Sequence, residues 1–334
     1  MRMRCRTLVG LVCGVLVLGL LVQGGSAQGQ LTPVSFRLNY VAVGLHAPFY
    51  FGLDRGFYRQ EGIDLKIGEG TGSATTVRLV GNKSDLFGFT DAGTAVIGIA
   101  QGIPVKVIAP VYQINAFAVI APADSGITKP KDLEGKRVGD TPGDALDALW
   151  PAVVGANSID ASRVRIVAMD PAAKVPAMLN KQIDAILGGA DDQAATLKGQ
   201  GMRVTVLRFA DFGVATIGLS IIAHQDTIRN QPGLVRAFLR ATVRSWDAAR
   251  KDPNAAIAVE RKYIPALNDT VAHEQLAVAV SSLFAKDATG LLRATDKDWL
   301  DTVVLLARYM GGSGQYSARY YYDQSLLPGS LPGR

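Results

Sequence analysis

Residues 34–67 read VSFRLNYVAVGLHAPFYFGLDRGFYRQEGIDLKI, and this stretch decides the fold. Its first residues, Val34 to Tyr40, alternate apolar and polar side chains as a half-buried strand does. From His46 to Gln60 the apolar side chains recur at helical spacing, and Gly62 ends that helix. Ile63 to Ile67 alternates again and predicts a second strand. A strand, a helix and a strand in so short a stretch predict two parallel strands joined by a helix that covers the sheet.

The same alternation continues along the chain and then restarts. A strand at 86–89 leads into a helix that begins at Asp91 and ends at Gly102, and a strand at 105–111 follows. Alternating strands and helices predict mostly parallel sheets with helices on both faces, hence an α/β fold. A second series starts after Pro122 with predicted strands at 137–139, 164–169, 183–187 and 204–209, and predicted helices dominate beyond residue 223, at 231–251, 254–263, 271–284 and 296–310.

The first 27 residues have the order of features found in secretory signal peptides. Three arginines precede an uncharged apolar run from Leu8 to Val22, and small residues follow it from Gly25 to Ala27. We therefore expect a signal peptide over residues 1–27, cleaved near Ala27, and a mature protein in the periplasm. An uncleaved membrane anchor is the alternative, although the apolar run is shorter than the roughly 20 residues that a spanning helix needs.

Cysteine content and charge argue against several classes of function. The two cysteines, Cys5 and Cys13, would leave with the signal peptide, so the mature chain could hold no disulfide, thiolate metal site or cysteine nucleophile. Loss of the three signal arginines would lower the net charge from +6 to +3. The remaining charges are scattered, so we expect no nucleic-acid binding. No second apolar run approaches spanning length, so we expect the mature protein to be soluble.

Glycine, hydroxyl and acidic residues follow the predicted strands at the ends where α/β sheets bind ligands. Glycine there lets backbone N–H groups approach a ligand, and helix N-termini favour hydrogen-bond acceptors. Tyr40 could stack on a flat ligand, and His46 could form a hydrogen bond with one. The candidate ligand-binding residues are Asn39, Tyr40, His46, Thr71, Gly72, Ser73, Thr90, Asp91, Ala92, Thr141, Pro142, Gly143, Asp144, Gly189 and Asp191.

Several of these residues also have a purely structural explanation. Ser73, Asp91 and Thr141 are typical helix N-caps, each worth about 1 kcal/mol. Five such loops on one side of two sheets nevertheless favour a ligand site for the set as a whole. Acidic residues outnumber basic ones in these loops, so we expect a neutral or zwitterionic solute, with heterocycles among the candidates, rather than an anion.

Four stretches carry a resemblance to a known family. They are LNY at 38–40 with HAPFY at 46–50 and GFYRQEGID at 56–64, then FGFTDA at 87–92, QGIPV at 101–105 and KDLEGKRVG at 131–139. In order and spacing, over roughly residues 33–250, the chain resembles the periplasmic substrate-binding proteins of ABC transporters for sulfonates, taurine, nitrate and thiamin-pyrimidine precursors.

The resemblance implies a two-lobed, type II periplasmic-binding-protein fold with two crossings between the lobes, which we place near Phe117 to Ala121 and Ile217 to Ile222. Lobe 1 would be discontinuous, made of residues 31–118 plus 222–334, and lobe 2 would comprise 119–221. Such lobes close on a small-molecule ligand. The protein, expected to be a monomer, would then deliver the ligand to an ABC permease with its ATPase.

Two other functions stay open from the sequence. The lobes could report a ligand to a signalling receptor, and a fungal pyrimidine-precursor synthase is similar in fold. That synthase depends on a cysteine-rich motif that the mature chain lacks, and no nucleophile–base pair or paired-carboxylate motif is visible, so we expect no enzyme. We also expect no cofactor, and no metal because the three histidines lack the spacing of metal ligands.

Overall fold

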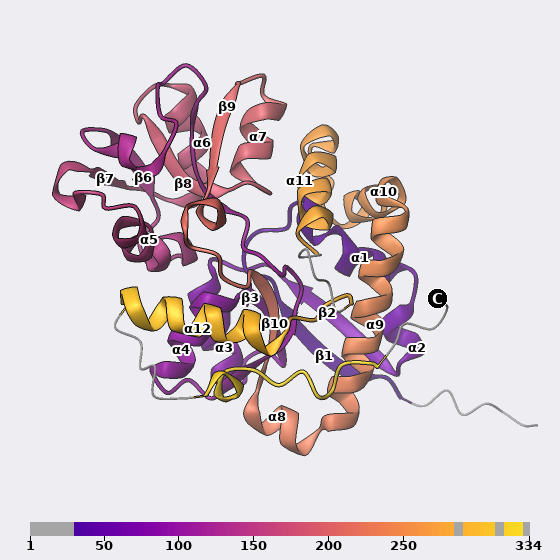
Figure 1. Cartoon of the computed structure of the whole chain (residues 1–334). Helices are drawn as coiled ribbons and strands as arrows, with labels where there is room; N and C mark the ends of the chain where they lie inside the picture. Colours follow the sequence, from indigo (N-terminus) through magenta and orange to yellow (C-terminus); the bar gives the residue numbers. More distant parts are fainter. Residues whose placement is uncertain (1–29, 284–289, 311–316, 330–334) are drawn as a thin grey trace, which may run out of the picture. The chain divides into compact units, whose positions relative to one another are not determined.

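The computed structural model describes residues 30–283, 290–310 and 317–329 (Figure 1). The predicted signal peptide, residues 1–27, lies outside these residues. Within the described part, strands and helices alternate as the sequence predicts, and helices dominate after the last strand. No helix in the described ranges has both the length and the apolar character needed to cross a membrane.

Sheet A has five strands in the order β2-β1-β3-β10-β4. Strands β2, β1 and β3 are parallel, and Phe36 of β1 pairs with Ile67 on one side and Phe87 on the other. Strand β10 runs antiparallel to both β3 and β4. The strands are β1 (Thr32–Arg37), β2 (Ile63–Gly68), β3 (Phe87–Asp91), β4 (Val105–Pro110) and β10 (Leu219–His224).

Sheet B repeats this arrangement with the order β7-β6-β8-β5-β9. Strands β7, β6 and β8 are parallel, and β5 is antiparallel to β8 and β9. Each sheet is therefore mostly parallel, with one antiparallel strand that enters directly from the other sheet. The strands are β5 (Phe117–Pro122), β6 (Arg137–Asp140), β7 (Arg165–Ala168), β8 (Ala185–Gly189) and β9 (Val204–Arg208).

Two passages connect the sheets, one between β4 and β5 and one between β9 and β10. Buried Asn115 joins them, because its Nδ2 donates to the Val214 carbonyl at 3.0 Å and to Thr216 Oγ1 at 2.8 Å. Gly218 allows this close approach, since a Cβ there would lie 2.9 Å from the Asn115 Cα. The lobe boundaries at 118/119 and 221/222 remain a prediction.

Aromatic side chains form the core between sheet A and its helices. Phe49 lies 4.8 Å from Phe36, 5.0 Å from Phe89 and 5.6 Å from Trp246, measured between ring centroids. Tilted and edge-on contacts of this kind stabilise a core beyond the area they bury. The helices around this sheet are α1 (Ala47–Asp54), α2 (Phe57–Gln60), α3 (Ser73–Gly81), α4 (Ala92–Ala100), α8 (Gln225–Asn230) and α9 (Pro232–Lys251). Helix α10 (Pro253–Tyr263) packs on α1 and α9, and α11 (Asp269–Ser282) packs on α10 and on the 3-10 turn at Gly44–His46.

A second apolar cluster joins helices of both sheets through α12 (Figure 1). Helix α12 packs against α4, which covers sheet A, and against α5, which covers sheet B. Trp299 of α12 is fully buried and stacks on Tyr322 at 4.5 Å, while Thr302 Oγ1 accepts a hydrogen bond from the Ile217 N–H at 3.0 Å. The sheet B helix of this cluster is α5 (Ala145–Ala156), and α12 spans Asp296–Met310. Helices α6 (Pro171–Leu179) and α7 (Gln193–Gly199) contribute instead to a separate apolar cluster with residues of β5 and β8.

The predicted helix over 46–60 is interrupted in the structure. A 3-10 turn at Gly44–His46 leads into α1, and α2 begins only after Gly56, whose φ of 71° lies in the left-handed region. Glycine occupies that region at little cost, whereas a side chain would be strained there. Periodicity therefore identified the helical segment but missed the break at Gly56.

Candidate functional site

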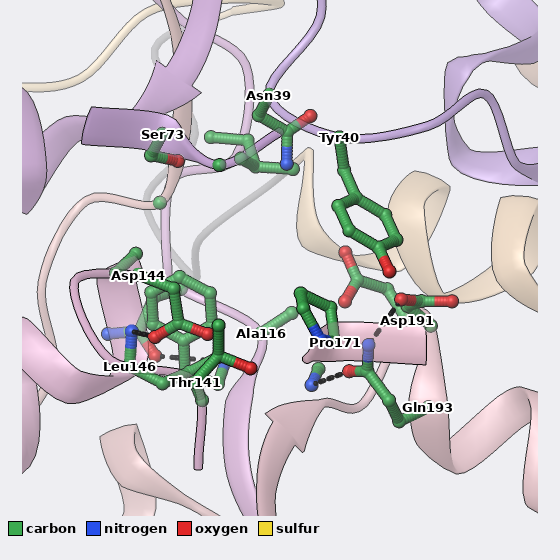
Figure 2. Close-up of a pocket in the computed structure, with 18 of the residues that line it drawn as sticks. Asn39, Tyr40, Ser73, Ala116, Thr141, Asp144, Leu146, Pro171, Asp191 and Gln193 are labelled. Atoms are coloured by element: carbon green, nitrogen blue, oxygen red, sulfur yellow. Dashed lines mark hydrogen bonds between the residues drawn. The ribbon is translucent and has the colours of Figure 1, made fainter. Parts of the chain in front are cut away.

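A cavity of about 290 Å³ lies between the two sheets (Figure 2). Its lining follows the carboxyl ends of parallel strands in both sheets, where α/β proteins bind ligands. The volume lies at the lower end of the range for small-molecule sites. The sheet A wall comprises Asn39, Tyr40, Val43, Leu45, Thr71, Gly72, Ser73, Thr75, Arg78 and Leu219; the sheet B wall comprises Phe117, Thr141–Leu146, Pro171, Lys174, Gly189, Asp191, Asp192 and Gln193; and the passages add Tyr112, Asn115, Ala116 and Gly218.

The loop after β2 is held against the end of β1 by two backbone hydrogen bonds. The Gly70 N–H donates to the Tyr40 carbonyl at 2.9 Å, and the Gly72 N–H donates to the Asn39 carbonyl at the same distance. A Cβ on Gly70 would lie only 2.0 Å from the Leu38 carbonyl oxygen, so this approach requires glycine. The result is a backbone frame that fixes Asn39 and Tyr40 at the cavity.

Asn39 is also fixed through its side chain. Its Oδ1 lies 2.9 Å from Nε2 of His46, a residue with no exposed surface. Nδ1 of His46 accepts a hydrogen bond from the Val43 N–H at 3.1 Å, and burial lowers the pKa of His46 to about 3. His46 is therefore neutral at physiological pH and lies behind the cavity wall.

In the sheet B wall, a buried lysine is held by two carboxylates. Nζ of Lys174 lies 3.3 Å from Asp144 Oδ2 and 3.7 Å from Asp140 Oδ1, and it donates to the Leu187 carbonyl at 3.0 Å. Lys174 and Asp140 are 1% and 2% exposed, so this charge cluster is almost completely removed from water. Burial, and then the neighbouring Asp144 charge, raises the pKa of Asp140 to about 7.

Two further acidic residues follow β8 at the other side of the same wall. Asp191 is buried, and burial raises its pKa, which the Tyr112 hydroxyl and the Arg208 guanidinium partly oppose. Burial and the Asp191 charge raise the pKa of Asp192 to about 7. Figure 2 shows the hydroxyl of Tyr40 directed from the sheet A wall toward Asp191.

Gln275 of α11 connects the sheet A side of the cavity to Asp192. Its Oε1 accepts from the Gly44 N–H at 2.9 Å, and its Nε2 donates to Asp192 Oδ1 at 2.9 Å. The connection continues because Gln193 Nε2 donates to Asp192 Oδ2 at 2.5 Å, while its Oε1 accepts from the Gly189 N–H at 2.7 Å. A continuous chain of hydrogen bonds thus spans the two sheets at the cavity edge.

Most residues proposed from the sequence lie together in the cavity lining, and four do not. Asn39, Tyr40, Thr71, Gly72, Ser73, Thr141, Pro142, Gly143, Asp144, Gly189 and Asp191 line it, whereas His46, Thr90, Asp91 and Ala92 are buried outside it.

The four residues outside the lining are taken up by structural roles. Asp91 is the N-cap of α4, because its Oδ1 accepts from the Thr94 N–H at 2.8 Å. Its Oδ2 is buried without a hydrogen-bond partner among the described residues, and burial raises the pKa of Asp91 to about 7. Thr90 donates from Oγ1 to the Ser73 carbonyl at 3.2 Å, Ala92 begins α4, and His46 supports Asn39.

The hydroxyls of two lining residues are already bonded to the backbone. Ser73 Oγ accepts from the Asp91 N–H at 3.1 Å, so its own proton is free to donate elsewhere. Thr141 Oγ1 donates to the Met169 carbonyl at 3.0 Å. Neither side chain caps its own helix, because Gly72 and Asp144 occupy the N-cap positions of α3 and α5.

Sequence reasoning missed several residues of the cavity. Lys174 stands in the apolar helix segment PAAKVPAML, where a lone charge that must be buried is a signal for a charged partner. Tyr112, Asn115 and Ala116 lie in the passage between the sheets, which no strand-end rule identifies, and Phe117 is the first residue of β5. Asp192 and Gln193 directly follow a proposed residue, and only the path of the loop shows that they face the cavity.

Buried carboxyl groups with raised pKa values gather around this cavity. Asp140 and Asp192 each have a pKa of about 7, and that of Asp191 is also raised. Groups perturbed by burial and by specific charged neighbours in a cleft are typical of functional sites. Near neutral pH these carboxyl groups are therefore partly protonated and can donate as well as accept hydrogen bonds.

Comparison with known proteins places the chain in a family. The family model described as NMT1/THI5 like matches residues 44–256. The chain belongs to the NMT1/THI5-like family. The riboflavin-binding protein RibY of Chloroflexus aurantiacus is 25% identical over 320 residues, covering 92% of this chain and 88% of RibY.

An enzyme is also among the relatives of this NMT1/THI5-like protein. The 4-amino-5-hydroxymethyl-2-methylpyrimidine phosphate synthase of Uromyces fabae is 30% identical over 251 residues, covering 70% of this chain and 72% of the synthase. This finding corrects the expectation that the chain is not an enzyme. That expectation relied on the lack of a cysteine-rich motif. It is wrong, because relatives of this chain are synthases.

Solved structures confirm the fold expected from the resemblance. The periplasmic aliphatic sulphonate binding protein SsuA from Escherichia coli matches with a TM-score of 0.69 at 15% identity, covering 88% of this chain and 99% of SsuA. The NMT1/THI5-like chain therefore has the two-lobed periplasmic-binding-protein fold, with two mixed sheets flanked by helices.

Proposed function

We propose that this protein is the solute-binding component of an ABC importer, which captures a small organic molecule between its two sheets and delivers it to a membrane permease. The observation that carries the proposal is the cavity of about 290 Å³ lined from both sheets by loops at strand ends. A ligand there contacts both lobes at once, so its binding energy favours the closed arrangement.

The ligand proposed for this cavity is neutral or zwitterionic, with heterocycles among the candidates. The sheet B wall carries Asp144, Asp191 and Asp192, and its one lysine is already paired with carboxylates. A purely anionic solute would meet these carboxylates, whereas a solute with N–H donors would bond to them. The riboflavin-binding relative supports a heterocycle, and Tyr40 and Phe117 offer aromatic surface in the lining.

The proposed site of action is outside the cytoplasm. The signal-like residues 1–27 support this location, together with the likeness in fold to a periplasmic protein. The proposed ligand-binding residues are those predicted from the sequence that also line the cavity, above all Asn39, Tyr40, Asp144 and Asp191.

Mass spectrometry of the protein purified without refolding tests the proposed function. We expect release of a small organic molecule with both hydrogen-bond donors and acceptors. A thermal-shift panel of riboflavin, 4-amino-5-hydroxymethyl-2-methylpyrimidine, taurine and nitrate then tests the ligand class. A binder at 100 times its dissociation constant should raise the free energy of unfolding by about 2.7 kcal/mol.

Two outcomes would contradict these proposals separately. No released molecule and no stabilisation by any compound of the panel would contradict a solute-binding function. Stabilisation by taurine and nitrate alone would leave solute binding intact but overturn the proposed ligand class.

A further inference from the structure

The backbone N–H of Val43 determines which nitrogen of His46 carries the proton. A backbone N–H can only donate, so Nδ1 of His46, 3.1 Å away, must accept and be unprotonated. The ring is neutral because complete burial disfavours its charged form. The remaining proton therefore lies on Nε2.

The protonated Nε2 in turn determines the orientation of the Asn39 amide. Nε2 donates to the oxygen of Asn39 at 2.9 Å, which leaves the amide nitrogen on the opposite side. Figure 2 shows this nitrogen turned toward the cavity, and it donates to no other described residue. Rotation of the amide would place its NH₂ group against a histidine donor and would lose the bond.

Two further features keep Asn39 in this position. Its backbone carbonyl accepts from the Gly72 N–H at 2.9 Å, so the main chain cannot follow a rotated side chain. The His46 ring packs edge-on against Phe89 with centroids 5.9 Å apart, which restricts rotation of the imidazole. The orientation of the Asn39 amide is therefore set in two steps. The Val43 N–H fixes the proton position on the buried His46 ring, and that ring then fixes which atom of the amide faces the cavity.

We infer that His46 is a positioning residue that makes Asn39 an obligate hydrogen-bond donor, so that the cavity selects ligands that place a hydrogen-bond acceptor against Asn39. The sheet A wall presents the Asn39 Nδ2 donor, and the Ser73 hydroxyl has a free proton beside it. The sheet B wall presents the carboxylates of Asp144 and Asp191.

A donor on one wall and acceptors on the other limit which ligands the cavity can bind. This conclusion about the ligand rests on the proposed function. The ligand must offer an acceptor, such as a carbonyl oxygen or a ring nitrogen, toward Asn39. It must offer N–H donors toward the carboxylates on the other side. A molecule with only acceptors would accept a hydrogen bond from Asn39 but would be repelled by the carboxylates of the sheet B wall.

The first test is spectroscopic and needs no ligand. A long-range proton–nitrogen NMR spectrum of the purified protein should show the His46 ring as the Nε2–H tautomer, unchanged from pH 5 to pH 8. The signal is assigned by its loss in His46→Gln. An Nδ1–H tautomer, or titration with a pKa near the ordinary value of about 6.5, would overturn the inference.

The second test measures affinity for the tightest binder among riboflavin, 4-amino-5-hydroxymethyl-2-methylpyrimidine, taurine and nitrate. Asn39→Asp keeps the shape and the acceptor for His46 but replaces the donor with an oxygen, so we expect about 100-fold weaker binding. His46→Leu frees the amide to rotate, and we expect about 10-fold weaker binding. His46→Gln can donate from a similar position and should restore affinity to within about threefold of wild type.

A matched control and the remaining outcomes complete the design. His224 is also buried, and its Nδ1 also accepts a backbone N–H, that of Asp226, but it does not line the cavity. His224→Gln should leave affinity unchanged. Unaltered binding in Asn39→Asp overturns the inference alone, whereas no binding of any probe to wild type counts against the proposed function, and the NMR spectrum still decides the tautomer.

Discussion

Loops after parallel strands in each sheet begin with a helix-capping aspartate, but the two aspartates are placed differently. Asp91 caps α4 after a sheet A strand, and Asp144 caps α5 after a sheet B strand. Asp91 has no exposed surface and lies outside the cavity, whereas Asp144 lines the cavity and faces Lys174. The difference teaches that the same capping role can leave an aspartate buried in the interior or place it in the wall of a cavity.

The two carboxyl groups also differ in their hydrogen-bond partners. Asp91 has one oxygen without a hydrogen-bond partner among the described residues, and its pKa is raised to about 7 by burial. Both oxygens of Asp144 are bonded, one by the Leu146 and Asp147 N–H groups and the other by Lys174. The carboxyl group of Asp91 thus lies in the interior, whereas Asp144 presents a charge-supported acceptor at the cavity.

The largest expected effect comes from removing the cation of the sheet B wall. Lys174→Met should lower the free energy of unfolding by about 3–5 kcal/mol, because it leaves buried carboxylates without their counter-charge. Urea unfolding measures the change. Lys83→Met is the control, because its ion pair with Asp226 is exposed and contributes little. Equal losses in both variants would show that the buried cluster has no special role.

The pH dependence of stability tests the sheet A side. The pKa of Asp91 is about 7 in the folded protein, above its ordinary value of 3.8, so the folded state binds more protons between these values. Stability should therefore fall as pH rises from about 4 to about 7. Asp91→Asn removes this pH-dependent contribution. The free energy of unfolding of the variant, relative to wild type, should therefore rise by a few kcal/mol from about pH 4 to about pH 7 and then level off.

Thermal or urea unfolding at several pH values measures that difference. Asn keeps an oxygen that can cap α4, so loss of the cap does not obscure the result. A difference between Asp91→Asn and wild type that stays constant from pH 4 to pH 8 would contradict a buried carboxyl with a raised pKa at this position.

Ligand affinity should separate the two aspartates. Asp144→Asn removes a charged acceptor from the cavity and should weaken binding about 10–100-fold, which corresponds to about 1.4–2.8 kcal/mol. Asp91→Asn should change affinity by less than about threefold because its side chain does not reach the cavity. Calorimetric titration of both variants with the same compound provides the comparison, and similar losses would remove the distinction between the walls.

The smallest effect is expected at the connection between the sheets. Gln275→Ala breaks the bonds to Gly44 and Asp192 and should weaken binding about fivefold, near 1 kcal/mol. Gln60→Ala removes only an exposed contact with Arg244 and serves as the control. If Gln275→Ala binds as tightly as Gln60→Ala, the hydrogen-bond chain does not hold the sheets together around the ligand.

The sequence predicted the fold well because its evidence is local. Alternation in Val34 to Tyr40 and the apolar run at 105–111 identify strands without knowledge of their partners. The antiparallel entry of β5 was not predicted, because residues near 117–121 were interpreted only as a crossing between the lobes, whereas residues 117–122 pair with β8 and β9. Pairing between strands distant in sequence leaves no local signal.

The site was predicted in part for the same reason. The strand-end rule selected Asn39, Gly72 and Asp144, which line the cavity, and their contact with a ligand stays a prediction. The same rule could not distinguish Asp91 from Asp144, because both follow a strand and begin a helix. Lys174 lies within α6, and only the fold brings it to Asp144.

The crystal structure of the protein with its copurified small molecule tests the central claim most directly. We predict a molecule that lies between the sheets, with an acceptor toward Asn39 Nδ2 and N–H donors toward Asp144 or Asp191. A molecule bound outside this cavity, or one that turns an anionic group toward the sheet B carboxylates, would contradict the account.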